Sequence, residues 1–317
     1  MACRRHRPLI APRKVEEIGV LVHPVTRLTR GSTSGLEPSY HSSVKSDVSD
    51  ELINTCLFRP IAHQFVRVLY PTNVTPNQVT VASIIAGLVA AAFYAFAGMS
   101  YAPLAGLLIT LKDLLDSADG QLARAKQMYS RFGRFLDSVG DFVVNLVVFA
   151  AISYLLYRDT GWSPVFLLGL VGFLGISLRV SYHVFYQTSY LHLRSAYEAN
   201  RITEEIQKKD LAGDSRALRM QRLFLLLYGW QDRLMMRIDT WSMNGVSQDQ
   251  REAWYSNRTA LRLSGFLGLG TELFILMLCS VARRLDWYLA LNVVGMNAVW
   301  AGCVVYRKAV LARKIHP

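Results

Sequence analysis

Four aspartates stand in two pairs at spacings that could assemble a metal-dependent site. Asp116 and Asp119 are three residues apart, so they share one face of a helix. Asp137 and Asp141 are four residues apart and share a face of the next helix. Two antiparallel helices joined by a short loop would bring these faces together, and divalent cations would relieve the repulsion. Because hard oxygen ligands suit Mg²⁺ or Mn²⁺, the pattern predicts that the four carboxylates bind metal, with two ions expected.

Small and basic residues beside the aspartates add the features of a phosphate site. Gly120, Ala123 and Gly133 leave room for a flat or bulky group to approach the backbone. Arg124 offers a guanidinium fork that matches a phosphate. Paired metals, this arginine and a carboxylate that takes a proton from a hydroxyl describe phosphoryl-type transfer. Chance charges on solvated helix ends are the competing interpretation, which a four-carboxylate cluster near a bilayer boundary disfavours.

The aspartates belong to a chain that is rich in apolar segments. Of its 317 residues, 52% are hydrophobic and 18% are charged. A soluble domain carries roughly a quarter charged residues. Six stretches approach the ~20 residues that cross a bilayer. They are 79–99, 102–127, 133–157, 163–187, 260–281 and 285–306. The predicted fold class is an all-α integral membrane protein with six transmembrane helices.

Polar and amphipathic segments flank the predicted spans. Residues 1–50 are polar, serine-rich and basic, and we expect them to be disordered. Residues 52–70 suit an N-terminal amphipathic surface helix on an anionic leaflet, with a packed core helix as the alternative. Residues 51–189 would contain the surface helix, four spans and the motif. Residues 190–259 would form a cytoplasmic helical insert, and residues 260–317 would contain two spans and a basic C-terminus.

Basic residues are distributed as a membrane topology predicts. The net charge is +12. With the N-terminus in the cytoplasm, thirty Lys and Arg lie in cytoplasmic segments and three, Arg158, Arg283 and Arg284, on the opposite side. A charge that follows the spans in this way disfavours nucleic-acid binding. The prediction is a multi-pass membrane protein whose active site faces the cytoplasm.

The insert contains a second amphipathic pattern. Residues 216–241 carry a basic face and a face of Leu, Met and Trp. A helix that lies on the membrane is the first expectation, and packing on the core or a dimer contact are the alternatives.

Polar residues inside the predicted spans have open roles. Arg179 in the fourth span either faces a cavity and binds an acceptor phosphate or extends to the headgroups. Lys112 either supports the metal site or pairs with groups on neighbouring helices. Glu272 has no assigned partner, and Asn292 and Asn297 are interpreted as interhelical hydrogen-bond groups.

The motif as a whole resembles the signature of the CDP-alcohol phosphotransferases, D-x-x-D-G-x-x-A-R-x8-G-x-x-x-D-x-x-x-D. All eight fixed positions match between Asp116 and Asp141. The stretch from Thr75 to Thr80 is similar to the family's usual entry to the first span. The resemblance implies cleavage of the diphosphate of a CDP-linked alcohol, transfer of the phosphoryl-bearing part to another hydroxyl, and release of CMP. The loop after the fourth span is usually short in the family, whereas this chain has about seventy residues there.

The resemblance also implies roles for individual residues. Asp137 and Asp141 are the predicted catalytic residues, with Asp141 as general base. The predicted metal ligands are Asp116, Asp119, Asp137 and Asp141. The predicted CDP-binding residues are Asp116, Gly120, Ala123, Arg124, Gly133, Asn77 and Thr80. The candidate acceptor-binding residues are Arg131, Arg134 and Arg179. A homodimer in contact with membrane lipids is the expected assembly.

The resemblance leaves the substrates open. One group of the family uses CDP-diacylglycerol with a small polar alcohol such as serine, inositol or inositol phosphate. Another uses CDP-choline or CDP-ethanolamine with diacylglycerol, and its usual larger number of spans favours the first group here. The run from Ser130 to Gly133 resembles inositol-phosphate-type enzymes. Phe142 disfavours glycerophosphate and cardiolipin synthases, which often carry Lys at this position.

Two classes without catalysis compete with this interpretation. A transporter or channel with an acidic gate accounts for the spans and the carboxylates, but not for the spacing of the motif. A catalytically inactive scaffold could use its insert to bind a partner. The complete set of four aspartates and Arg124 argues against the scaffold.

Overall fold

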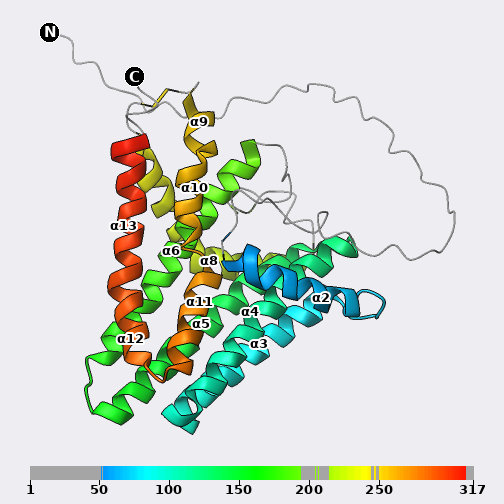
Figure 1. The fold of residues 1–317 in the computed structure, drawn as a ribbon. Helices are drawn as coiled ribbons and strands as arrows, with labels where there is room; N and C mark the ends of the chain where they lie inside the picture. The colour runs from blue at the N-terminus through cyan, green and yellow to red at the C-terminus, as the bar shows by residue number, and fades with distance from the viewer. Residues whose placement is uncertain are drawn as a thin grey trace. The chain divides into compact units, whose positions relative to one another are not determined.

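The computed structural model describes residues 51, 53–193, 204, 206, 214–243, 246–247 and 250–311. Every regular element in these residues is a helix, which confirms the all-α prediction (Figure 1). The polar segment 1–50 and part of the insert 190–259 lie outside the described residues.

Six long helical segments form the membrane bundle. They are α3 with η2 (Pro76–Ala92, Phe93–Ala97), α4 (Ala102–Ala125), α5 (Arg131–Thr160), α6 (Val165–Leu193), α10 with α11 (Arg258–Gly265, Leu269–Val281), and α12, η5, α13 and η6 (Leu285–Ala290, Leu291–Met296, Asn297–Val305, Tyr306–Leu311). Within the described residues, five of these segments are long and apolar enough to cross a bilayer. The sixth, α4, has 24 residues, carries the first half of the motif and packs against α3 and α11. The chain is an integral multi-pass membrane protein, in agreement with the six predicted spans.

The turns from α3 to α4, from α5 to α6 and from α11 to α12 lie at one end of the bundle, at the bottom of Figure 1. Arg158, at the end of α5, donates to the Ala95 carbonyl in η2 at 3.5 Å. Arg283 and Arg284 form the turn between α11 and α12. The three basic residues predicted on the non-cytoplasmic side therefore lie in or beside these turns, whereas the aspartates lie in the other half of α4 and α5.

Local capping fixes where the motif-bearing helices begin. The Thr75 backbone N–H donates to Gln78 Oε1 at 2.8 Å as part of a capping box at the start of α3. Ser130 Oγ accepts a hydrogen bond from the Gly133 backbone N–H at 2.9 Å and caps α5. Caps of this kind satisfy N–H groups that have no partner within the helix. They also decide on which turn of each helix the functional residues fall.

The predicted surface helix is α2 (Arg59–Leu69), which lies along α4 (Figure 1). Ala62 and Val66 are buried in one cluster with Leu122 of α4. Val68, on the other face, is 71% exposed. This division between a packed face and an exposed apolar face agrees with the amphipathic pattern of the sequence.

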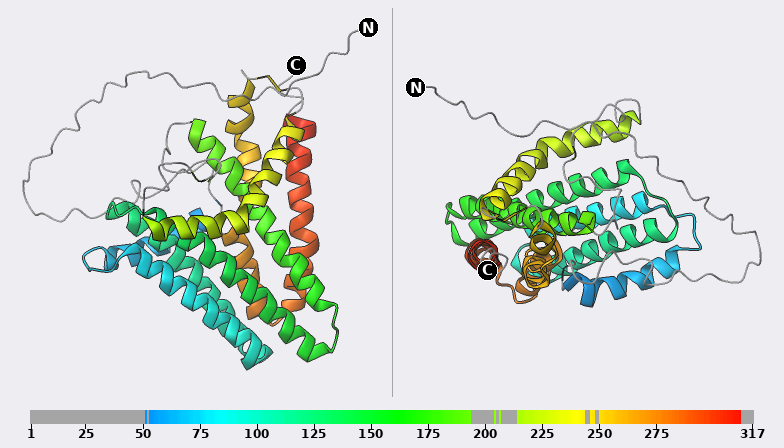
Figure 2. Two further views of the ribbon diagram at one scale, coloured as in Figure 1. Left: turned by 180° about the vertical axis from the view of Figure 1, so that it is seen from behind. Right: turned by 90° about the horizontal axis from the view of Figure 1, so that it is seen from above.

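The insert contributes α8 (Ser215–Ser242), which crosses α5 and α6 (Figure 2). Gln231 is buried where it meets Ser177 and Ser181 of α6, whereas Leu226 and Trp230 are exposed. Of the three arrangements predicted for this segment, packing on the core is the one observed within the chain. Seen from above in Figure 2, α2 and α8 flank the bundle on opposite sides.

Candidate active site

Three of the four predicted metal ligands meet between α4 and α5. One carboxylate oxygen from each of Asp116, Asp119 and Asp137 lies within 4.8 Å of the others. Asp119 is buried, and Asp116 and Asp137 are half-buried. Carboxylates that are this close together and shielded from bulk water repel one another. Their oxygen atoms are ligands that a divalent cation such as Mg²⁺ or Mn²⁺ prefers.

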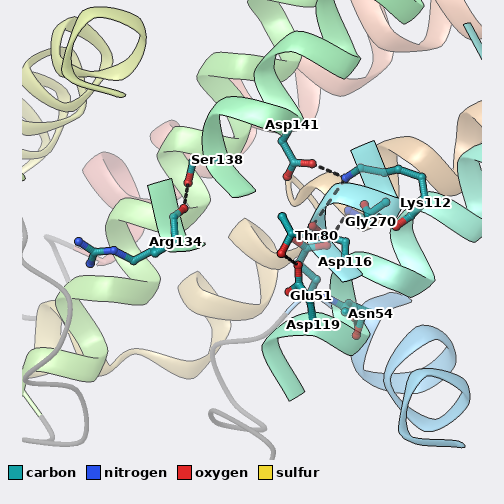
Figure 3. A network of polar contacts seen from close by, with 12 residues as sticks. Glu51, Asn54, Thr80, Lys112, Asp116, Asp119, Arg134, Ser138, Asp141 and Gly270 are labelled. Atoms are coloured by element: carbon teal, nitrogen blue, oxygen red, sulfur yellow. Dashed lines mark hydrogen bonds and ion pairs between the residues drawn. The ribbon is translucent and has the colours of Figure 1, made fainter. Parts of the chain in front are cut away.

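The fourth aspartate, Asp141, is engaged by a lysine. Lys112 Nζ forms an ion pair and a hydrogen bond with Asp141 Oδ1, and it lies 3.9 Å from Asp116 Oδ1 (Figure 3). The Lys112 side chain is only 1% exposed. This lysine therefore places one positive charge among the carboxylates and links α4 to α5.

The start of α3 also reaches the motif. Thr80 Oγ1 donates a hydrogen bond to Asp119 Oδ2 at 2.5 Å. Gly133, in the first turn of α5, faces Asn77, because a Cβ atom built at this glycine would overlap Asn77 Oδ1. The structure thus brings Asn77 and Thr80, which were predicted at the edge of the nucleotide site, into contact with motif residues.

We expect Gly133→Ala to destabilise the protein by about 1–3 kcal/mol, the usual cost of overpacking. The added methyl would overlap Asn77 Oδ1 and lie 2.8 Å from the capping Ser130 Oγ. Gly229→Ala is the matched control, because its Cβ would lie 3.7 Å from the nearest atom, in Leu225. Thermal unfolding in detergent checks the pair, and equal melting temperatures would contradict the crowding inferred at Gly133.

The predicted phosphate ligand lies on the same face of α4 as the first aspartate. Asp116, Gly120 and Arg124 follow one another at intervals of four residues. The Arg124 guanidinium passes beside Gly120, with Nη1 3.5 Å from the position of a Cβ atom there. Ala123, the remaining small residue of this part of the motif, is half-buried. The glycine therefore leaves the arginine head close to the helix backbone, next to the aspartates.

A cavity of about 380 Å³ adjoins the aspartates. Asp116, Asp137 and Asp141 form one part of its wall. Side chains from α5, α6 and α8 line most of the rest, and many of them are apolar. The polar ones include Asn145, Ser181, Gln187, Thr188, Tyr228 and Asp232. A cavity of this size with converging polar groups is suited to a small polar molecule.

Two of the three arginines predicted to bind an acceptor lie near this cavity. Arg134 lines it, and its Nη1 forms an ion pair with Glu204 of the insert at 2.8 Å. Arg131 is exposed and donates to Gln221 Oε1 of α8 at 3.3 Å. Both guanidinium groups approach the ring of Phe135. An acceptor that binds Arg134 would therefore compete with Glu204.

The third, Arg179, does not line the cavity. It is fully buried and pairs with Glu272 of α11. It also donates to the Asn292 carbonyl at 3.2 Å and to Asn297 Oδ1 at 2.6 Å. Asn292 Nδ2 donates to Glu272 Oε2 at 2.9 Å. This network confirms the interhelical role of the two asparagines and gives Glu272 its partner, and it engages the guanidinium of Arg179 within the bundle.

The sequence did not single out the cavity residues of α6 and α8. Ser181 and Gln187 lie in a span whose pattern is apolar overall, and Tyr228 and Asp232 lie in the insert. The periodic pattern of 216–241 was the available signal. It predicted a helix with an apolar face but not the neighbour that this face meets.

Residues 73–200 match the family model described as CDP-alcohol phosphatidyltransferase. This segment contains the whole motif and the helices that position it. The match agrees with the signature recognised in the sequence, and this segment of the chain is similar to the CDP-alcohol phosphatidyltransferase family. Members of this family are enzymes that transfer substituted phosphate groups.

Curated relatives share parts of this segment. The chain is 37% identical over 110 residues to "Bifunctional IPC transferase and DIPP synthase" of Thermococcus kodakarensis. These aligned residues are 35% of this chain and 24% of the relative. The protein of the same name from Archaeoglobus fulgidus is 40% identical over 94 residues, or 30% of this chain and 18% of the relative. "Archaetidylinositol phosphate synthase" of Pyrococcus horikoshii is 38% identical over 76 residues, which are 24% of this chain and 38% of the relative. The chain therefore spans well under half the length of these relatives.

Proposed function

We propose that the chain catalyses metal-dependent transfer of a phosphoryl-bearing group from a CDP-linked alcohol to a hydroxyl acceptor, with release of CMP, in phospholipid biosynthesis. One observation carries the proposal: Asp116, Asp137 and Asp141 line a single cavity next to Asp119 and Lys112. Ionisable groups clustered within membrane helices at a cavity are costly, and such clusters mark functional sites.

Each half of the motif has a role in this reaction. Asp116, Asp119, Asp137 and Asp141 would hold two Mg²⁺ or Mn²⁺ ions, which when bound neutralise the charge of the donor diphosphate. The residues that bind CDP would be Asp116, Gly120, Ala123, Arg124, Gly133, Asn77 and Thr80. Arg124 suits a diphosphate oxygen, because its guanidinium lies at the backbone of Gly120.

Asp141 would act as the general base, with Asp137 beside it. The acceptor hydroxyl loses its proton to Asp141, and its oxygen forms a bond to the phosphorus that carries the donor alcohol. The bond from that phosphorus to the oxygen of CMP breaks, and CMP leaves with that oxygen. Lys112 would orient Asp141, since it holds the Asp141 carboxylate at the edge of the cavity.

The preferred donor is CDP-diacylglycerol, and the preferred acceptor is a small polar alcohol such as inositol phosphate or serine. The name of the Pyrococcus relative contains inositol phosphate, and the run from Ser130 to Gly133 resembles enzymes of that type. The polar side chains among the largely apolar lining of the cavity beside Asp141 support a small acceptor that bears hydroxyl groups. Transfer from CDP-choline or CDP-ethanolamine to diacylglycerol is the second candidate.

The active site would open to the cytoplasmic leaflet, where a lipid donor and a soluble acceptor can meet. The distribution of Lys and Arg supports this orientation, because three basic residues lie in the turns at the opposite end of the bundle. A homodimer is proposed as the assembly on the family resemblance alone.

CMP release by the detergent-purified protein tests the proposed function. With Mg²⁺ or Mn²⁺ and CDP-diacylglycerol, we expect CMP to form with one of serine, glycerol 3-phosphate, inositol or inositol phosphate, and to stop when the metal is chelated. Release only from CDP-choline or CDP-ethanolamine with diacylglycerol would establish the second candidate. The absence of CMP release with every donor would favour a scaffold or a transporter.

A further inference from the structure

The helix α8, which lies outside the motif, forms part of the cavity that contains Asp137 and Asp141. Phe224, Tyr228 and Asp232 of α8 all line this cavity. They are four residues apart, so they lie along one face of the helix. The long insert of this chain therefore supplies a wall of the site in which the acceptor hydroxyl would meet Asp141.

Polar contacts hold α8 in this position. Tyr228 Oη donates to the Ser138 carbonyl of α5 at 3.0 Å. Gln231, which is 1% exposed, accepts hydrogen bonds from Ser177 Oγ at 3.1 Å and Ser181 Oγ at 2.6 Å on α6. The Tyr228 hydroxyl stays protonated as a donor, because burial and then the charges of Asp141 and Asp137 raise its pKa.

The C-terminal half of α8 is fixed by a buried carboxylate. Asp239 is 4% exposed and accepts hydrogen bonds from Tyr186 Oη at 2.8 Å, Trp254 Nε1 at 3.0 Å and Tyr255 Oη at 2.6 Å. These donors come from α6 and from α9 (Arg251–Ser256). With both halves anchored, the cavity-facing residues of α8 have defined positions.

Asp232 is the α8 residue whose carboxylate could bind a molecule in the cavity. It lines the cavity, and in the described part of the chain no hydrogen bond or ion pair engages its carboxylate. Burial, and then the nearby charge of Glu204, raises the pKa of Asp232 to about 6. The group is therefore ionised at pH 7.5 and can accept two hydrogen bonds from a bound molecule.

The surroundings of Asp232 define the kind of molecule. Ser181, Gln187 and Thr188 of α6 line the same cavity, and the aromatic side chain of Tyr228 also lines it. A carboxylate, hydroxyls, an amide and an aromatic ring together suit a compact ring or chain that bears several hydroxyl groups. Neighbouring hydroxyls donate well to a carboxylate, and the C–H face of such a molecule packs on an aromatic ring.

We propose that α8 forms the acceptor side of the active site and that Asp232 binds hydroxyl groups of a polyhydroxylated acceptor, which deepens the proposed function and rests on it. One hydroxyl of the acceptor would face Asp141, while others bind Asp232. A phosphate on the acceptor is compatible with Arg134 only if it displaces Glu204 from the 2.8 Å ion pair. Inositol and inositol phosphate are therefore the acceptors to compare.

Asp232→Asn tests the proposal with little change in shape. At pH 7.5 we expect the KM for inositol or inositol phosphate to rise about 10-fold to 100-fold, as for one lost hydrogen bond to a charged group. The KM for the CDP-linked donor should stay within about twofold, since the motif is untouched. Asp159→Asn is the matched control, because Asp159 is 38% exposed at the end of α5 away from the motif. An unchanged acceptor KM, or an equal rise in the donor KM, would overturn the assignment of Asp232.

A binding measurement separates this proposal from the proposed function. Calorimetry with the Mg²⁺-loaded full chain uses inositol and inositol phosphate as ligands, so it needs no turnover. We expect at least one of them to bind, and to bind at least about 10-fold more weakly to Asp232→Asn than to Asp159→Asn. If the wild type binds a polyol in this way but releases no CMP from any donor, the transferase proposal fails and the α8 site stands. If neither ligand binds, or both variants bind equally, the α8 site fails, whatever the CMP assay shows.

Discussion

Asp141→Asn is expected to lower the rate of CMP release by about 10²–10⁴-fold, the usual contribution of a general base. An amide cannot take the proton of the acceptor hydroxyl. The substitution also removes the charge of the ion pair with Lys112, whose side chain is 1% exposed and which retains its 3.9 Å contact to Asp116. We therefore expect the loss mainly in kcat, with a smaller change in the KM for the donor.

The control for this variant is Asp286→Asn. Asp286 pairs with Arg284 on the surface, is 52% exposed and lies at the turn opposite the site. This variant should release CMP at the wild-type rate. Size-exclusion chromatography of the Asp141→Asn protein separates a chemical defect from misfolding. If folded Asp141→Asn and Asp137→Asn both keep more than about half of the CMP-coupled transfer, the roles assigned to these aspartates are wrong.

Glu272→Ala is expected to destabilise the protein by about 3–5 kcal/mol, the range for removing one partner of a buried ion pair. Arg179 and Glu272 are both 0% exposed. Without Glu272, the guanidinium keeps only the Asn292 carbonyl and Asn297 Oδ1 as acceptors. An uncompensated charge then remains in the interior of the bundle, where water cannot solvate it. Thermal unfolding of the detergent-purified protein measures the effect.

The double variant Arg179→Met/Glu272→Leu gives the decisive comparison. Replacing both members of a buried pair by apolar residues is often neutral or stabilising, so most of the lost stability should return. Neither residue lines the cavity, and we expect the double variant to keep acceptor affinity. A raised KM for the acceptor in a stable double variant would instead support the predicted role of Arg179 in acceptor binding.

The sequence alone determined the spans, the order of the motif and its ligand chemistry. The reason is that these features are local along the chain. The spacing of Asp116 and Asp119 places both carboxylates on one turn, and the capping residue Ser130 fixes the start of α5. A helix satisfies its backbone groups within one apolar stretch of bilayer length, and the predicted 133–157 and 285–306 correspond to helices at 131–160 and 285–311.

The tertiary structure alone decided which distant residues share a site. Arg179 and Glu272 are 93 positions apart, and no local pattern links them, so the sequence left Arg179 between two roles. Tyr228 meets Ser138 across 90 positions, which places the insert on the wall of the cavity. A helical period shows which face of a segment is apolar, but the neighbour of that face is set by packing of the whole bundle. For this reason the motif was predictable from its spacing, whereas the cavity beside it depends on how α6 and α8 fold against α5.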